Sequence, residues 1–296
     1  MRIVSLLPSA TEIAFDLGLG DDVVGVTHEC DYPAGAATKA VVSHSNLDHD
    51  GMTPAEIDAA VAGSIDVGDA IYRLDTEMFA SLQPDLILAQ DLCRVCAVPT
   101  GQVEDALDTL GCTAEVVSLD PANLDEVIDC VVAVGRAAGL EDRAAARAAE
   151  LRERLAAVRA ATADHPRTRT FALEWGDPPF TGGHWVPEMI EIAGGECVLG
   201  EPGLESRRIT WGEIEEGAPD AIVFIPCGYG LDEATIQGRE LLGRPEIAEA
   251  TLFAVDASSY FSRPGPRLVD GIELLAAALH PGAVPDPPPG RVTRLR

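Results

Sequence analysis

The sequence contains two cysteines three positions apart, Cys93 and Cys96, directly after an apolar run at residues 86–89. That run predicts a buried strand, so the two thiols lie where a strand gives way to a loop. Ligands of open α/β sheets bind outside the carboxyl ends of the strands. Paired thiols at such an edge can bind a metal, form a redox couple or pack as two small side chains.

Two more cysteines follow predicted strands, which would bring four thiols to neighbouring loops. The four are Cys30, Cys93, Cys96 and Cys227. Four thiolates suffice for zinc or for an iron–sulfur cluster. The chain would then be an intracellular metalloprotein or enzyme, with Glu174 or Glu188 as its acid or base. The alternatives are four small buried side chains, or a redox-active Cys93 and Cys96 pair without metal.

Polar and aromatic side chains also cluster after the predicted strands. Those that could contact a ligand are His28, Glu29, Glu174, Trp175, His184, Trp185, Tyr229, Tyr260, Phe261 and Arg263. The aromatic rings among them could form flat walls for a large planar ligand, although packing of a helix on the sheet explains Trp185 equally well. Because these loops share one edge in a doubly wound lobe, the sequence predicts a ligand cleft between two facing lobes.

The elements that must position these residues come in two runs of alternating strands and helices. We expect an N-terminal α/β lobe over 1–121, a linking helical segment over 122–165, a C-terminal α/β lobe over 166–281 and a loose tail over 282–296. Ser9 and Glu12 predict a capping box at the start of the first helix. The stretch 41–74 is expected to be loop-rich, with a helical turn starting near residues 53–54. The breaker-free stretch 141–161 predicts a helical rod of roughly 30 Å.

The charge balance narrows the classes of partner. The chain carries 49 acidic and 21 basic residues, for a net charge of −28. Such a surface repels phosphate backbones, so we expect no nucleic-acid partner. No apolar run approaches the roughly 20 residues of a membrane span. No phosphate-binding or nucleophile-elbow motif occurs in the required strand–turn–helix context, which favours a binding protein over an enzyme.

The N-terminus and the cysteine count bear on location. The apolar stretch at residues 1–8 is too short for a signal peptide, and no small-residue cleavage site follows it. Seven cysteines, an odd number, favour reduced thiols over a disulfide framework. We therefore expect the chain as given to be cytoplasmic, with its thiols free.

The order of lobe, long helix and lobe resembles the substrate-binding proteins that serve iron-siderophore, haem and cobalamin ABC importers. The segments that carry the resemblance to the cobalamin-binding members are residues 2–12, 82–87, 218–223 and 263–267. The resemblance implies two Rossmann-like lobes with mainly parallel sheets, joined by one long α-helix, with the ligand cleft between the lobes. It also implies binding of a corrinoid or a similar metal chelate, with His28 or His184 approaching the cobalt or a corrin amide.

More narrowly, the chain resembles a signal-less branch of these cobalamin-binding proteins. Its hallmarks are the segments 28–30, 91–96, 183–188 and 226–228. The class docks to an ABC importer through one exposed acidic residue on each lobe. Glu77 matches the first position, whereas Gly212 stands at the second, with Glu213 adjacent.

Overall fold

The fold is described from a computed structural model of the 296-residue chain. It describes residues 1–47, 51–67, 71–91 and 114–296. Cys93 and Cys96 lie outside the described residues. The chain divides into two compact units: unit 1 comprises 1–121 and 126–149, and unit 2 comprises 122–125 and 150–296.

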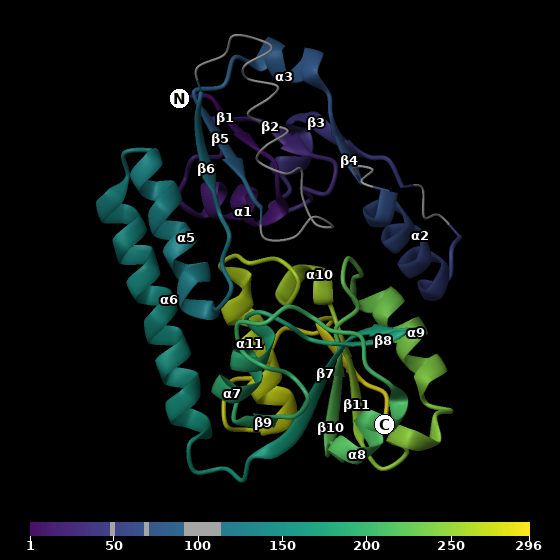
Figure 1. The fold of residues 1–296 in the computed structure, drawn as a ribbon. Coiled ribbons are helices and arrows are strands. Elements are labelled where there is room, and N and C mark those ends of the chain that lie inside the picture. Colours follow the sequence, from purple (N-terminus) through teal and green to yellow (C-terminus); the bar gives the residue numbers. More distant parts are fainter. Residues whose placement is uncertain (48–50, 68–70, 92–113) are drawn as a thin grey trace. The chain divides into compact units, whose positions relative to one another are not determined.

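Unit 1 is built on one six-stranded sheet (Figure 1). Its strands are β1 (Ile3–Ser5), β2 (Val23–Thr27), β3 (Ala40–Ser45), β4 (Tyr72–Leu74), β5 (Leu86–Ala89) and β6 (Glu115–Ser118). The order is β4-β3-β2-β1-β5-β6, and every pairing is parallel except that of β3 with β4. Alternate strand residues such as Val4, Val42 and Ile87 form a core with Phe79.

The helices of unit 1 follow the strands. They are α1 (Pro8–Asp16), η1 (Ala36–Thr38), α2 (Pro54–Val67), α3 (Thr76–Leu82), α5 (Leu124–Ala137) and α6 (Glu141–Thr162), the last two shared with unit 2. The expected capping box on α1 is wrong, because Leu7 is the N-cap and Pro8 opens the helix. Proline suits that position, since its missing N–H would have no helical partner. Gly135 of α5 leaves room for Ala144 of α6, 2.2 Å from where a Cβ would stand.

Unit 2 is built on a second sheet, drawn in green and yellow in Figure 1. Its strands are β7 (Thr168–Gly176), β8 (Pro179–Thr181), β9 (Gly195–Cys197), β10 (Ala221–Phe224), β11 (Thr251–Val255) and β12 (Val292–Arg294). Its other helices are α7 (Val186–Ile192), α8 (Trp211–Gly217), α9 (Leu231–Leu241), η2 (Pro245–Ile247), α10 (Ala257–Tyr260) and α11 (Arg267–Leu279). The order is β12-β11-β10-β7-β8, with β9 also paired to β7.

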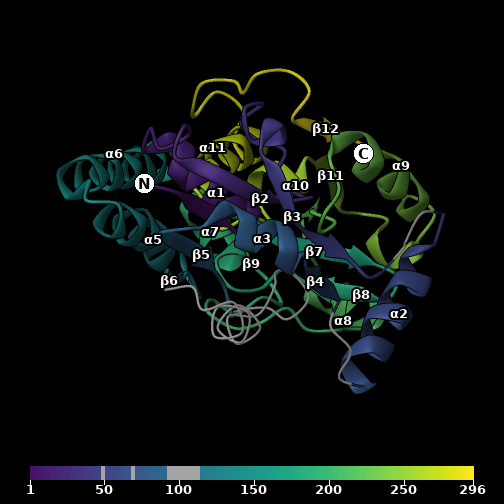
Figure 2. The ribbon, with the colours of Figure 1, turned by 90° about the horizontal axis from the view of Figure 1, so that it is seen from above.

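Helices cover both faces of the sheet in unit 2. Figures 1 and 2 both place α7 and α11 on one side and α9 on the other. On the α9 side, the alternate strand residues Phe171, Ile222 and Leu252 pack with Ile214 of α8 and Leu241 of α9. Strands buried on both faces are typical of doubly wound sheets. The predicted fold class, two α/β lobes with mainly parallel sheets and a long helix between them in sequence, is confirmed.

The 22-residue helix α6 is tied to each unit by arginine. In unit 1, Arg147 Nε lies 2.7 Å from Asp16 Oδ2. In unit 2, Arg154 donates to Glu273 through two nitrogens, at 2.9 and 2.7 Å, and to Asp270 at 2.6 Å. The paired carboxylates raise the pKa of Arg154 further, despite partial burial. None of the described helices combines the length and apolar character needed to cross a membrane.

Two expectations about irregular segments are wrong. The stretch 41–74 contains β3 and β4, whose short and mixed apolar pattern conceals their period, and the helical turn expected near residues 53–54 is the start of the 14-residue helix α2. The tail is not loose to its end, because β12 pairs antiparallel with β11. The run of prolines at 287–289 precedes β12 and does not interrupt it.

Arg296 provides a test of how the tail is held. Its guanidinium donates to the carbonyls of Ala250 (3.0 Å), Ile247 (2.7 Å) and Leu242 (3.4 Å). Arg296→Met removes these three hydrogen bonds, although the Ile247 carbonyl keeps its bond from Ala250 N at 3.1 Å, so we expect the free energy of unfolding to fall by about 1–3 kcal/mol. Urea denaturation measures the loss. Exposed Arg294→Met is the matched control, and an equal loss in both variants would contradict this role for Arg296.

Candidate functional site

Three strand-end loops of unit 2 meet at one edge of its sheet. β7, β10 and β11 run parallel, so their carboxyl ends lie together. The loops are hydrogen-bonded to one another: Ser258 N donates to Tyr229 O at 3.0 Å, and Cys227 N donates to Glu174 O at 3.4 Å. The structure therefore brings together the predicted site residues that follow these strands.

Aromatic rings occupy this edge in two different ways. Trp175 and Tyr229 are partly exposed, with ring centroids 6.0 Å apart and an interplanar angle of 32°. Trp185 and Phe261 are buried, at 6% and 2% exposure, and Trp185 Nε1 donates to Phe261 O at 2.8 Å. The first pair can present a flat surface to a ligand, whereas the second pair supports the loops from below.

His184 is held in an unusual conformation beside Trp185. Its φ of +51° lies in the left-handed region, and backbone hydrogen bonds to Leu204 (2.6 Å) and from Gly203 (2.9 Å) fix it there. Its ring stacks on Trp185 at 5.5 Å. Within the described part of the chain, Nε2 is buried and has no hydrogen-bond partner. Burial lowers the pKa of His184, which the nearby Glu205 carboxylate only partly opposes, so the imidazole is neutral at pH 7.

Glu174 lies at the end of β7 and is held by two donors. Ser206 Oγ donates to Oε2 at 2.6 Å, and the backbone N–H of Gly183 also bonds to this carboxyl. Desolvation raises the pKa of Glu174, and the two hydrogen bonds lower it by less. Gly183 is required here, because a Cβ on it would stand 2.3 Å from Ser206 N. The backbone around Ser206 and Gly183 therefore packs directly on the Glu174 carboxyl group, whose buried surroundings disfavour the charged form.

Tyr260 and Arg263 complete the predicted residues of this edge. Tyr260 is 9% exposed, and guanidinium groups of Arg291 and Arg267 lie over its ring, with Cζ 4.9 and 5.8 Å from the centroid. Arg263 is half-buried. Neither Arg267 nor Arg291 was predicted. The tail was expected to be loose, which concealed Arg291, and no local motif identified Arg267 as a site residue.

Unit 1 has a corresponding set of residues at the ends of its strands. His28 is exposed, with Nδ1 3.2 Å from Ser43 O and its ring 5.9 Å from that of Tyr72. The Tyr72 hydroxyl donates to Glu29 Oε1 at 3.3 Å. His28 and Glu29 are therefore joined by Tyr72, which the sequence did not suggest because β4 was not expected.

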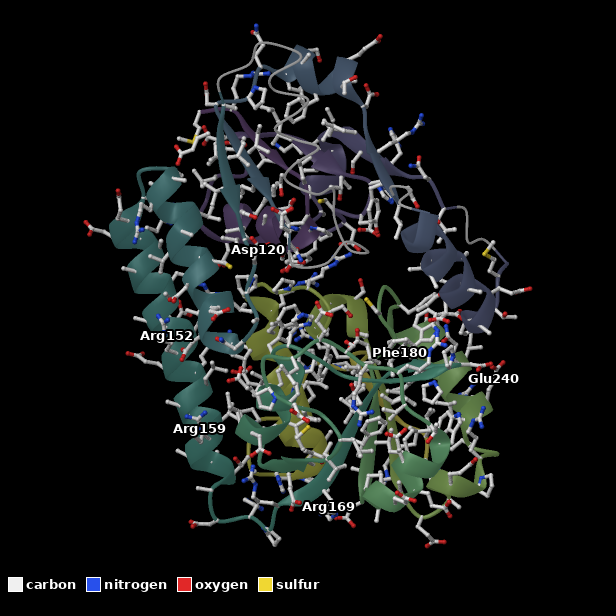
Figure 3. All side chains as sticks on the ribbon, viewed as in Figure 1. Asp120, Arg152, Arg159, Arg169, Phe180 and Glu240 are labelled. Carbon is white, nitrogen blue, oxygen red and sulfur yellow. The ribbon has the colours of Figure 1, made fainter. Side chains whose placement is uncertain are left out.

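Asp120, labelled in Figure 3, follows β6 of unit 1 and fixes the start of the loop after β5. Its Oδ1 accepts from Asp91 N, and its Oδ2 accepts from the Ser118 hydroxyl. Asp120 was not among the predicted residues. Its carboxylate anchors Asp91, the last residue described before Cys93.

The cysteines that the structure describes do not form a metal site. Cys30 is 4% exposed, and its sulfur lies 3.1 Å from the hydroxyl oxygens of both Thr11 and Thr27, which supports the interpretation of a small buried side chain. Cys227 is exposed. Among the described residues, no group of three or more His, Cys, Asp or Glu side chains is arranged to hold a metal ion. The metal hypothesis gains no support here, and its Cys93 and Cys96 lie outside these residues.

Glu174 and Glu188, the candidate acid or base of an enzyme, both accept hydrogen bonds from other parts of the chain. Glu188 Oε2 accepts from Leu124 N at 2.8 Å, which satisfies a backbone donor at the start of α5. Glu174 is enclosed by Ser206 and Gly183. The described residues at the strand-end edge of unit 2 thus offer flat rings and neutral hydrogen-bonding groups, which suit binding.

The sequence matches one protein family over most of its length. A family model described as "Periplasmic binding protein" matches residues 3–249. A Bacillus subtilis protein named "Uncharacterized ABC transporter substrate-binding lipoprotein YvrC" is 28% identical over 295 residues, covering 95% of this chain and 80% of that protein. A "Cobalamin-binding protein" of Halobacterium salinarum is 26% identical over 291 residues, covering 94% of this chain and 69% of that protein.

Solved structures share the fold at lower identity. The periplasmic vitamin B12 binding protein BtuF of Vibrio cholerae has a TM-score of 0.67 at 24% identity, covering 94% of this chain and 96% of that chain. A periplasmic haem-binding protein of Pseudomonas aeruginosa has a TM-score of 0.72 at 21% identity, with coverages of 99% and 97%. These similarities establish the architecture of the chain.

The raised pKa of Glu174 gives a pH-dependent prediction. The native state holds this proton more tightly than the unfolded chain, so stability falls as the pH rises from 4.5 through the raised value. Glu174→Gln removes that loss. We therefore expect the Tm of Glu174→Gln minus that of wild type to increase as the pH rises through this window. Above the window the difference should stay constant. Thermal melts of both proteins across pH 4–8 provide the measurement.

Glu240→Gln removes an exposed carboxylate from α9 of the same unit and is the matched control. If the Tm difference between Glu174→Gln and wild type stays constant across the pH range, Glu174 does not hold a raised pKa.

The described cysteines should differ sharply in reactivity. Burial raises the pKa of Cys130 to about 12, and Cys30 is buried, whereas Cys227 is exposed. Because the thiolate is the reactive form, N-ethylmaleimide at pH 7.5 should modify Cys227 faster than Cys30 or Cys130, and these two should stay intact until the chain unfolds. Peptide mass spectrometry assigns each site, and Cys227→Ser is the control. Equal rates at Cys130 and Cys227 would refute the described burial.

Proposed function

Because the chain belongs to the periplasmic binding protein family, we propose that it is a substrate-binding protein whose ligand is a corrinoid. In this proposal the strand-end loops of unit 2 supply the ring contacts and hydrogen bonds. His28 and Glu29 at the strand ends of unit 1 are further candidate contacts. No bond of the ligand is broken, and the chain acts by binding alone.

The names of the relatives support a large metal chelate. Besides the Halobacterium protein, a protein of Vibrio cholerae named "Vitamin B12-binding protein" is 25% identical over 289 residues, covering 94% of this chain and 88% of that protein. Solved structures with the same fold include both B12-binding and haem-binding proteins. The choice between these ligands therefore has to rest on the chemistry of this chain's own residues.

The uncharged character of the edge carries the proposal. Burial raises the pKa of Glu174 and lowers that of His184, so both side chains resist taking a charge, and Trp175 and Tyr229 offer partly exposed rings. A corrin ring carries mostly amide side chains, which exchange hydrogen bonds with neutral donors and acceptors. Haem carries two carboxylates, which the net charge of −28 disfavours. Neutral groups and flat rings together fit the corrinoid better.

His184 is the residue we assign to the polar centre of the ligand. Its Nε2 is buried without a partner among the described residues, so a bound donor or a metal would satisfy an atom that is otherwise unpaired. The left-handed backbone and the stacking on Trp185 hold the ring in place before binding. A preorganised imidazole reduces the entropy lost on binding.

An ABC importer is the partner that this function implies. One relative is named as an ABC transporter substrate-binding lipoprotein. Glu77 is exposed in the first turn of α3 and remains the candidate docking residue of unit 1. Glu213 of unit 2 is already engaged, because it forms a capping box with Thr210 and an ion pair with Arg207 at 3.1 Å. The cytoplasmic location stays a prediction from the sequence.

Ligand titration tests the proposal directly. We expect cyanocobalamin to bind with a micromolar or lower Kd in isothermal titration calorimetry, and haemin to bind more weakly. Replacing Trp175 by leucine should weaken cyanocobalamin by about tenfold, because it removes a ring that contacts the ligand. Tighter binding of haemin, or no binding of cyanocobalamin, would contradict the proposal.

Trp211→Leu is the matched control for the loss of an indole. Trp211 opens α8, which precedes β10, and its ring lies under Arg244 at 4.1 Å, away from the strand-end loops. This variant should bind cyanocobalamin as wild type does. Circular dichroism confirms that both variants are folded.

A further inference from the structure

The C-terminal tail carries an arginine to the strand-end edge of unit 2. β12 runs antiparallel to β11, with Val292 opposite Val255. Arg291, one residue before β12, accepts a hydrogen bond from Asp256 N at its carbonyl, at 3.1 Å. Since Asp256 follows the carboxyl end of β11, this pairing fixes the backbone of Arg291 at the edge where the candidate site lies.

The Arg291 guanidinium lies over Tyr260 and has no acidic partner. Its Cζ is 4.9 Å from the ring centroid, and that of Arg267 is 5.8 Å away. Within the part of the chain that the structure describes, the Arg291 guanidinium forms no ion pair and donates no hydrogen bond. The Tyr260 hydroxyl likewise has no hydrogen-bond partner there, although the side chain is only 9% exposed.

An unpaired, half-buried arginine is unexpected in a chain with 49 acidic residues. The carboxylates that act on Tyr260 are those of Asp256 and Asp270, and both are engaged. Asp256 accepts from Ser259 N at 3.0 Å, and Asp270 pairs with Arg154 at 2.6 Å. Neither forms an ion pair with Arg291, so among the described residues its charge remains available to a group from outside the chain.

Other arginines of unit 2 show the contrasting, structural arrangement. Arg169, at the opposite end of β7 in Figure 3, pairs with Glu196 and donates to the carbonyls of Gly217 and Ala218. Arg296 is likewise used on backbone carbonyls. These guanidinium groups each donate several hydrogen bonds to the protein, whereas that of Arg291 has a ring below it and no acceptor among residues 1–47, 51–67, 71–91 and 114–296.

We infer that Arg291 and the Tyr260 hydroxyl form a subsite for one anionic group, a phosphate or a carboxylate, at the strand-end edge of unit 2. The inference rests on the proposed function in one respect: we take the anion to be the phosphodiester of the bound corrinoid. Arginine forms paired hydrogen bonds with phosphate oxygens, and the phenol donates a third. Burial raises the pKa of Tyr260, so its hydroxyl keeps its proton at neutral pH.

This subsite complements the neutral groups around Glu174 and His184. A corrinoid with a nucleotide loop carries a single phosphodiester among many amides. One cationic position beside an otherwise uncharged surface matches that distribution of charge. It also distinguishes a ligand with one anionic group from haem, whose two carboxylates would require two such positions.

Two corrinoids with the same ring, one with and one without the phosphodiester, show how much that group contributes to affinity. Cyanocobalamin carries the phosphodiester and dicyanocobinamide lacks it. Losing the Arg291 hydrogen bonds should weaken cyanocobalamin by at least about tenfold in Arg291→Gln, since charge-assisted bonds contribute about 1.5–3 kcal/mol. Dicyanocobinamide should bind wild type and Arg291→Gln equally. Tyr260→Phe should show the same selective loss, to a smaller extent.

Arg294→Gln is the control, because it removes a charge from the same strand without contact to Tyr260. Equal weakening of both probes by Arg291→Gln, or no weakening of either, would overturn the subsite. A loss of haemin affinity alone would assign the subsite to a carboxylate and overturn the phosphodiester assignment.

A different result would show that the proposed function itself is wrong. If neither corrinoid binds wild type, the subsite is tested with inorganic phosphate by thermal melting. A rise in the Tm of wild type that is absent in Arg291→Gln would support an anion subsite for free phosphate. No response of wild type to phosphate would overturn it.

Discussion

The register between parallel strands in unit 2 is the constraint on which the candidate site depends. Leu173 pairs with Phe224, and Phe224 pairs with Ala254, so β7, β10 and β11 reach the edge of the sheet at the same level. The loops that begin there must satisfy their own backbone groups, and they do so with one another. The sheet therefore brings together side chains that are up to about 90 residues apart, from Glu174 to Arg263.

Electrostatics then decides what this edge can bind. The chain as a whole is strongly acidic, yet burial raises the pKa of Glu174 and lowers that of His184, because in both cases it penalises the charged form. The guanidinium of Arg291, which has no acidic partner among the described residues, adds a positive charge to this edge. An extended ligand with many amides and one anionic group fits this combination, and its affinity would come from rings, neutral hydrogen bonds and one charge-assisted contact.

The sequence predicted the features that depend on local pattern. Apolar runs such as Leu86–Ala89 and Ala221–Phe224 identified strands, and the resemblance of residues 2–12 to the cobalamin-binding class led to the correct family. It failed where distant partners decide the structure. β12 forms because β11 offers an unpaired edge, which no property of the tail itself indicates.

The same limit applies to the site. The position of Glu174 after a strand could be predicted, but its pKa depends on Ser206 and Gly183, which approach it through a loop closure. Phe261 looks like a ligand wall in the sequence and is buried in the structure, as is Trp185, for which packing was the equally good alternative. Tyr72, Asp120 and Arg291 were missed because each acts through a partner distant in sequence.

The central claim is that the strand-end loops of unit 2 bind a corrinoid. Hydrogen–deuterium exchange with and without cyanocobalamin tests it most directly, because it locates protection along the chain. We expect cyanocobalamin to slow backbone amide exchange at residues 174–185, 203–206 and 226–230, and at 256–263 beside Arg291. Protection confined to the opposite edge of the sheet, around Arg169 and Asp220, or no protection in unit 2, would contradict it.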